Sequence, residues 1–234
     1  MAIKVNGTTV IDDSRNLVNI VSGAGSPPPT MQVFTSSGTW TKPSGCTKVK
    51  VTVTGGGGAG GGSGAQSYWV HGHGGSAGGT AIEYIDVTSV SSVSVTVGAG
   101  GTGTTGTGGN GGASSFGSYC TGGGGTGGWG SQRPDFGDGT QSRPGGTASG
   151  GNINIVGGDS MIGSMAAGYS TGGQGGASIF GGGGAEVFIG NTGAWNGIAA
   201  SVYGAGGSGG GSETSTTTTG GNGMSGIVIV EEFY

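Results

Sequence analysis

The closest pair of side chains that could bind a metal ion is His71 and His73, the only two histidines in the sequence. Alternate residues of an extended strand point the same way, and imidazole nitrogens are common ligands of transition metals. The neighbouring Tyr68 and Trp69 favour a polar loop instead. We therefore predict no metal and keep His71 and His73 as secondary candidates.

Two carboxylates that could act in hydrolysis, Asp135 and Asp138, lie in the turn-rich segment 133–139. Glycoside hydrolysis uses such a pair. The segment also contains Pro134 and an Asp-Gly step, which are typical of a loop that orders itself through local hydrogen bonds and an ion pair with Arg133. Serines are numerous and histidines few, so no Ser/His/Asp triad can be identified. We expect no enzymatic activity.

A literal GxGxxG pattern follows a predicted strand at residues 98–103. A dinucleotide site needs a helix directly after this pattern, so that the helix N-terminus faces the pyrophosphate. Residues 104–108, Thr-Thr-Gly-Thr-Gly, cannot form that helix, and no glycine run is followed by the Lys-Ser or Lys-Thr of a P-loop. We expect no nucleotide and no other cofactor.

Aromatic residues in the segments between glycine runs are the strongest sign of a binding surface. Large rings cannot enter closely packed backbone, so they must lie at its ends, outside it or in an interface, where Tyr and Trp stack on sugars and on protein. The alternative is that some of them only cap the packed layers. The candidate binding residues, the loop aromatics and their neighbours, are Tyr68, Trp69, Trp129, Arg133, Asp135, Phe136, Tyr169, Trp195, Asn196 and Tyr203.

The elements that must position these residues are short strands. In residues 48–54 every second residue is valine, which indicates a strand with one buried face. The final run, 227–230, is apolar on both faces and suits a central strand or one covered by neighbouring chains. Together these strands form the only ordinary hydrophobic core that the sequence offers; the predicted ranges are 32–35, 39–41, 48–54, 80–87, 93–97 and 227–230.

The chain divides into three parts. Residues 1–29 open with an Asn-Gly step between β-branched runs, which predicts a hairpin, and end in a Pro-rich spacer. Residues 30–97 form a β platform. Residues 98–234 form a glycine-rich body with loops, and a final strand, 227–234, returns to the platform.

Glycine makes up 66 of the 234 residues, and all but six of these glycines lie between residues 55 and 225. Extended polyglycine II strands have about three residues per turn and no internal hydrogen bonds. Their N–H and C=O groups need partners, which parallel neighbours can supply if no side chain holds the backbones apart. We therefore predict a mainly β protein with a polyglycine II sandwich and essentially no helix.

The glycine-rich part contains an internal repeat. Residues 108–117 and 172–181 share the pattern GGxGGASxFG. Phe116 and Phe180 occupy the same place in it, and we expect both to cap the glycine layers.

Charge and cysteine content exclude several classes of protein. The formal net charge is −4, which gives no electrostatic reason to expect binding to nucleic acid or to an anionic membrane. Cys46 and Cys120 are too few for a disulfide framework, so we expect free thiols. The N-terminus has no apolar signal core, and no run of 18 apolar residues occurs, so we expect synthesis in a cytosol and no membrane insertion.

Several stretches of the chain form a recognisable set: residues 3–12, 34–43, the Val-rich strand into 55–58, 94–101, 111–117 and 225–230. Together they resemble the glycine-rich domain of bacteriophage tail-fibre proteins, and the resemblance covers most of residues 30–230 and the N-terminal hairpin. The alternation of glycine motifs with variable segments is also similar in organisation to the fibre-tip adhesins of T-even-like phages.

This resemblance implies a tail-fibre protein of the virion, in which polyglycine II layers support loops that bind a bacterial surface receptor. Residues 1–29 would attach it to other tail or baseplate proteins, and fibres of this kind imply a homotrimer. The alternative is a purely structural baseplate, fibre or capsid decoration protein whose aromatics pack against virion neighbours. An ice-binding protein would show ranks of regularly spaced threonines, and the bulky insertions argue against it.

Overall fold

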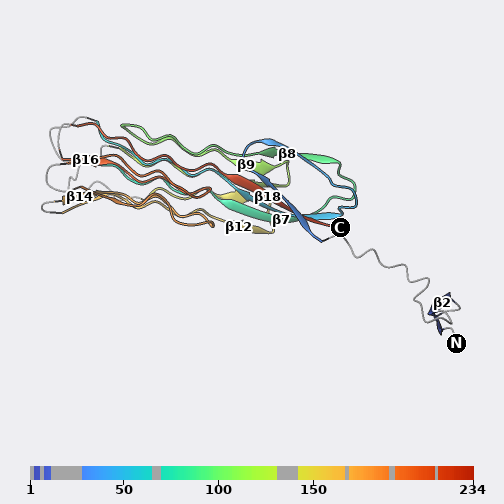
Figure 1. The fold of residues 1–234 in the computed structure, drawn as a ribbon. Coiled ribbons are helices and arrows are strands. Elements are labelled where there is room, and N and C mark those ends of the chain that lie inside the picture. The colour runs from blue at the N-terminus through green and yellow to red at the C-terminus, as the bar shows by residue number, and fades with distance from the viewer. Residues whose placement is uncertain are drawn as a thin grey trace.

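The computed structural model describes residues 3–5, 8–11, 28–64, 70–130, 142–166, 169–189, 193–213 and 216–234. Within these ranges the chain is all-β without a helix, and the body is elongated, with the C-terminus at one end (Figure 1). None of the described residues belongs to a helix that is long and apolar enough to cross a membrane. The predicted mainly β fold is confirmed.

Two antiparallel five-stranded sheets lie at the C-terminal end of the body, and we call them together the β sandwich. The first sheet has the order β12 (Ile153–Ile155), β7 (Thr80–Asp86), β5 (Lys48–Thr54), β18 (Ile227–Phe233) and β3 (Thr30–Phe34). The second has the order β11 (Ala148–Ser149), β10 (Cys120–Gly122), β9 (Ser114–Phe116), β8 (Ser92–Thr96) and β4 (Gly38–Thr41).

The strands expected from the sequence are present, although they divide between the two sheets. The final strand β18 is central, paired with β5 on one side and with β3 on the other. The strand expected at 93–97 lies in the second sheet, as β8. At the N-terminus, β1 (Ile3–Val5) and β2 (Thr8–Ile11) pair antiparallel, as the predicted hairpin requires.

The inward faces of the two sheets form the hydrophobic core. Alternate valines of β5 and β18 point inward and are fully buried. They meet Trp40 and Phe116 of the second sheet, whose rings lie 5.7 Å apart at 59°. The thiols of Cys46 and Cys120 are free and buried, and burial raises the pKa of Cys120 to about 11.

A buried carboxylate joins three strands of this core. Glu232 of β18 is only 2% exposed. Its oxygens accept hydrogen bonds from Trp40 Nε1 at 2.8 Å, from Gln32 Nε2 at 2.6 Å and from the Thr30 hydroxyl. The carboxylate therefore satisfies the indole N–H inside the core and fixes the edge strand β3 to β18.

We expect Glu232→Ala to destabilise the protein by about 2 kcal/mol, because it leaves the buried Trp40 N–H without an acceptor. Its neighbour Glu231 forms a half-exposed ion pair with Lys50, 2.6 Å between Nζ and Oε2, so Glu231→Ala should cost less than about 1 kcal/mol. Urea unfolding of both variants measures the difference. Equal losses would contradict the role given to Glu232.

Beyond the β sandwich the chain continues as extended glycine-rich segments that hydrogen-bond side by side, and we call this part the glycine lattice. Segment 55–63 follows β5. Its N–H groups donate in strict rotation to segments 70–79, 106–112 and 216–224. Its carbonyls accept from residues in 101–128 and 207–210, and the Ser63 carbonyl accepts from the Thr218 N–H. This rotation with a period of three is the pattern of polyglycine II.

Segments 70–79 and 204–210 are surrounded by backbone in the same way. These two and segment 55–63 also bond to one another, so they form the centre of the lattice. Apart from His71 and His73, their residues from 55 to 63, from 71 to 79 and from 204 to 210 are Gly, Ala and Ser, and all are buried. The interior of the glycine lattice therefore consists of hydrogen-bonded backbone instead of apolar side chains, as expected for a polyglycine II sandwich. Each hydrogen bond contributes about 0.5–1.5 kcal/mol.

Glycine is needed in the lattice for space rather than for unusual dihedral angles. A Cβ at Gly60 would lie 1.9 Å from the Ser208 carbonyl oxygen, and one at Gly206 would lie 1.9 Å from that of Gly75. The positive φ angles occur at turns instead, at Gly45, Gly117, Gly150, Gly181 and Gly204.

The two copies of the sequence repeat share this turn glycine, as Gly117 and Gly181, but their phenylalanines differ. Phe116 is fully buried between the sheets of the β sandwich, whereas Phe180 is 38% exposed. The expectation that both cap the glycine layers is therefore wrong for Phe116, because its copy of the repeat continues into strand β9.

Candidate functional site

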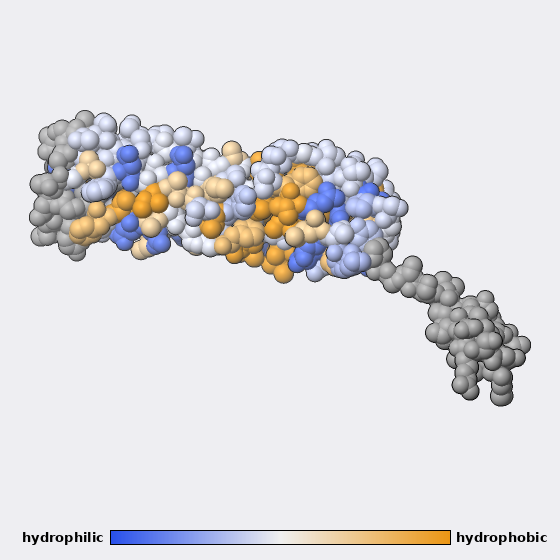
Figure 2. Space-filling model, in the orientation of Figure 1, coloured by the Kyte–Doolittle hydropathy of each residue, from blue (hydrophilic) through white to orange (hydrophobic). Residues whose placement is uncertain are grey.

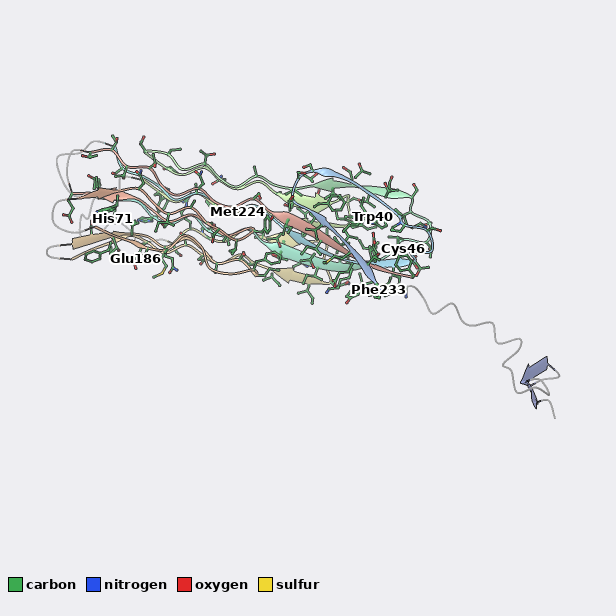
Figure 3. The ribbon with its side chains drawn as sticks, viewed as in Figure 1. Trp40, Cys46, His71, Glu186, Met224 and Phe233 are labelled. Carbon is green, nitrogen blue, oxygen red and sulfur yellow. The ribbon has the colours of Figure 1, made fainter. Side chains whose placement is uncertain are left out.

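The end of the lattice opposite the β sandwich, which we call the distal end, carries two small sheets. One contains β13 (Ser164–Ala166), β14 (Tyr169–Gly172) and β15 (Val187–Ile189), and the other contains β16 (Ala194–Trp195), β17 (Gly211–Ser212) and β6 (Val70–His71). Figure 1 shows β14 and β16 together there, and Figure 3 places His71 and Glu186 far from Trp40, Cys46 and Phe233.

The chain on both sides of the side-chain-rich insertions comes to this end. Val70 pairs with Ser212, and Ala194 also pairs with Ser212. Ala166 pairs with Tyr169, and Ser170 pairs with Ile189. Gly130 packs beside Gly62 and Gly106. The described residues that flank 65–69, 131–141, 167–168, 190–192 and 214–215 therefore lie within one small region.

His71 and His73 lie on the central segment 70–79 where it reaches the distal end. Both are buried, at 7% and 6% exposure, and their rings stack 6.0 Å apart with planes 6° from parallel. A Cβ at Gly163 would lie 2.5 Å from His71 Cδ2, so glycine there makes room for the ring. Burial, followed by the neighbouring His73, lowers the pKa of His71 to about 4.

The polar loop expected around the two histidines is wrong, since they belong to the interior of the lattice. Nδ1 of His71 is buried and has no hydrogen-bond partner among the described residues. No group of three or more His, Cys, Asp or Glu side chains that could hold a metal ion occurs among the described residues. The pair is best understood as two buried imidazoles packed against each other, with His73 also packed against Trp129.

Trp129 is a supporting residue at the base of one insertion. Its ring lies 5.9 Å from that of His73, at 58°, and Arg143 stacks over it with Cζ 4.4 Å from the ring centroid. Arg143 is held by hydrogen bonds from Nε to the Gly127 carbonyl and from its N–H to Ser160 Oγ. These contacts hold together the residues on the two sides of 131–141.

Trp195 is the large aromatic of the candidate set that the distal end exposes most clearly. It lies on the edge strand β16 and is 55% exposed. A Cβ at Gly193 would lie 2.6 Å from its Nε1, so the indole packs over a glycine. Phe188 of the adjacent strand β15 is 64% exposed, and together they give the distal end an accessible aromatic surface.

The remaining candidates divide into three groups. Asn196 has a structural contact, because its Oδ1 accepts a hydrogen bond from the Thr219 N–H at 2.8 Å. Tyr203 is half-buried, far along its segment from Trp195, next to the turn at Gly204. Tyr169 lies on β14, where only its backbone is described; Tyr68, Trp69, Arg133, Asp135, Phe136 and Asp138 lie outside the described residues.

Three residues of this region were missed from the sequence. Arg143 looked like an ordinary residue before a proline, and its spacing from Trp129 gives no signal of the stacking that joins them. Phe188 follows shortly after the glycine run 181–184 and could have been included on that ground. Glu213, just after β17, has both carboxylate oxygens buried with no hydrogen-bond partner in the part of the chain that the structure describes, and burial raises the pKa of this carboxyl.

A family model described as a glycine-rich domain matches residues 32–232 of the chain. No curated protein matches this chain. The matched region runs from β3 into β18, so it includes the β sandwich, the glycine lattice and the distal end, and it leaves out the N-terminal hairpin.

Proposed function

The chain belongs to the glycine-rich domain family, and we propose that it is a bacteriophage tail-fibre protein that recognises the surface of the bacterial host. The observation that carries this proposal is that the described residues flanking 65–69, 131–141, 167–168, 190–192 and 214–215 gather at one end of the glycine lattice, with exposed Trp195 and Phe188 beside them. A surface built in this way resembles the paratope of a binding protein, with variable segments and aromatics on a fixed support.

In this proposal the protein attaches to the virion at the end opposite the distal end, where the β sandwich lies. The β sandwich ends in β3, which directly follows the Pro-rich spacer and the N-terminal segment. In the proposal residues 1–29 join the protein to the tail or baseplate, and the lattice holds the distal end away from the particle. Binding rather than catalysis is the proposed activity, and the receptor is a protein or a polysaccharide of the bacterial surface.

We expect Trp195→Ala to weaken binding of the purified protein to host cells at least about tenfold, because an exposed aromatic in a binding surface is a typical hot spot. Fluorescently labelled protein, titrated on a panel of bacterial strains, measures the affinity. Phe180→Ala is the matched control, since Phe180 is also exposed but lies at the turn 178–181, away from the distal end.

Equal binding by both variants would contradict the placement of the receptor surface. If the wild-type protein binds no strain that the phage infects, while antibodies against it block virion assembly, the protein is instead a structural component. Thermal melting of each variant separates lost binding from lost folding.

A further inference from the structure

The outer face of the first sheet of the β sandwich is apolar and uncovered along most of its width. The register of the strands aligns Ile153, Ile82, Thr52, Ile229 and Val33 in one cross-strand row. The next row contains Tyr84, Lys50, Glu231 and Met31. Figure 2 shows hydrophobic surface gathered over the part of the body where Figure 1 labels β7, β12 and β18.

Exposure of these side chains is high for a sheet face. Met31 and Tyr84 are each 61% exposed, Ile153 is 55% and Val33 is 49%. The glycine lattice covers only the neighbouring row, where Thr54, Thr80 and Ile227 are buried. A contiguous apolar face of this kind marks an interaction surface, and its edge strand β3 has neither a charge nor a proline within it to prevent association.

The side chains across this face are arranged so that the face is complementary to the same face of a second chain. Lys50 on β5 and Glu231 on β18 lie side by side, one on each side of the line between the two central strands. A two-fold axis along this line, within the interface, sets β5 of one chain against β18 of its partner and β7 against β3. Each Lys50 then faces a Glu231, Tyr84 faces Met31, and Ile82 faces Val33.

We propose that this face binds the same face of a second copy of this chain about a two-fold axis. The pairing is isologous, so it closes as a dimer. It places apolar groups against apolar groups and each cation against an anion, whereas a carboxylate-rich or basic partner would match only one of the two charges. This arrangement differs from the homotrimer expected from the sequence, which needs a head-to-tail contact.

Four facing strands spaced about 4.8 Å apart offer a small area, so we expect a dissociation constant in the micromolar range. Sedimentation velocity of the full chain across micromolar concentrations should show a reversible monomer–dimer equilibrium. Val33→Glu should weaken the dimer about 100-fold or more, because it buries an unpaired charge. Ile198→Glu, at an exposed isoleucine of the glycine lattice, is the control and should leave the equilibrium unchanged.

A separate experiment, in which two charge variants are mixed, tests the pairing of Lys50 with Glu231 between the two chains. The single variants Lys50→Glu and Glu231→Lys should each fail to dimerise alone, since like charges then face each other. Mixed in equal amounts they should form a heterodimer, because each carboxylate now meets an ammonium across the axis. The ion pair within one chain cannot produce this rescue.

A wild-type protein that stays monomeric, or that forms a trimer, overturns the proposal. A dimer that is insensitive to Val33→Glu, or a mixture of the two charge variants that stays monomeric, overturns this face and this register. Circular dichroism of each variant verifies that it is folded.

Discussion

We expect Gly60→Ala to destabilise the protein by at least about 3 kcal/mol, and to lower its melting temperature by roughly 10 °C. The added methyl group would lie 1.9 Å from the carbonyl oxygen of Ser208 and 2.3 Å from its carbonyl carbon. A crowded side chain can change rotamer, but here the obstacle is backbone that is itself hydrogen-bonded on several sides. Relief requires the two central segments 55–63 and 204–210 to separate, which breaks the bonds from the Gly207 N–H to the Gly58 carbonyl and from the Gly210 N–H to the Gly61 carbonyl.

The matched control is Gly182→Ala, because a Cβ at Gly182 has no atom within 4 Å. That change should be neutral, or stabilising by several tenths of a kcal/mol through the unfolded chain. Gly60 and Gly182 look alike in the sequence, each within a run of glycines. If differential scanning calorimetry gave similar melting temperatures for both variants, backbone packing would not be what stabilises the lattice.

Acid should weaken the protein through His71. Its pKa in the folded state is about 4, because burial disfavours the charged imidazole, whereas the ordinary value is 6.5. Between pH 6.5 and about 4 the His71 imidazole therefore binds a proton in the unfolded chain but not in the folded protein. Stability is complete above pH 6.5, falls as the pH decreases, and levels off near pH 4 after a loss of about 3 kcal/mol.

The titratable groups near His71 determine which further variants the experiment needs. His73 stacks on its ring, and Glu213 lies just beyond the paired strand β17. The raised pKa of Glu213 acts in the opposite sense, since its contribution is present at acidic pH and is lost as the pH rises. His71→Gln should flatten the stability profile between pH 6.5 and 4, and Glu213→Gln should steepen the net loss.

Urea unfolding at a series of pH values measures these profiles. Asp86→Asn is a suitable reference variant, because hydrogen bonds from Thr88 lower the pKa of this exposed carboxyl and keep its titration below the window. A His71→Gln profile that follows the wild type would show that the acid response comes from elsewhere.

The sequence predicted the sandwich strands well because their signal is local. Alternating valines in 48–54 and the apolar run 227–230 fix both strand type and buried face without knowledge of the rest of the chain. The assignment of β8 to the second sheet could not be predicted, since it depends on which partner strand it meets. Glu232 was missed for the same reason, because the donors that justify its burial are about 200 residues away in the sequence.

For the candidate site, the sequence identified which segments carry side chains but not how each side chain is used. Trp129 and Trp195 have the same kind of glycine-rich surroundings, yet one is held between Arg143 and His73 and the other is exposed. His71 and His73 have neighbours typical of a loop, and the structure buries them. In a lattice whose contacts come from distant segments, the fate of a side chain depends on which carbonyl or ring lies beside it.

The hydrogen-bonding rotation of segment 55–63 also sets the order of events after translation. A third of its N–H groups donate to residues 216–224, which leave the ribosome long after it. Until then these N–H groups have only water as partner, and contacts so distant in the chain form slowly. A nascent chain can therefore build hairpins and small sheets first, while the glycine lattice closes only after residues 216–224 are released.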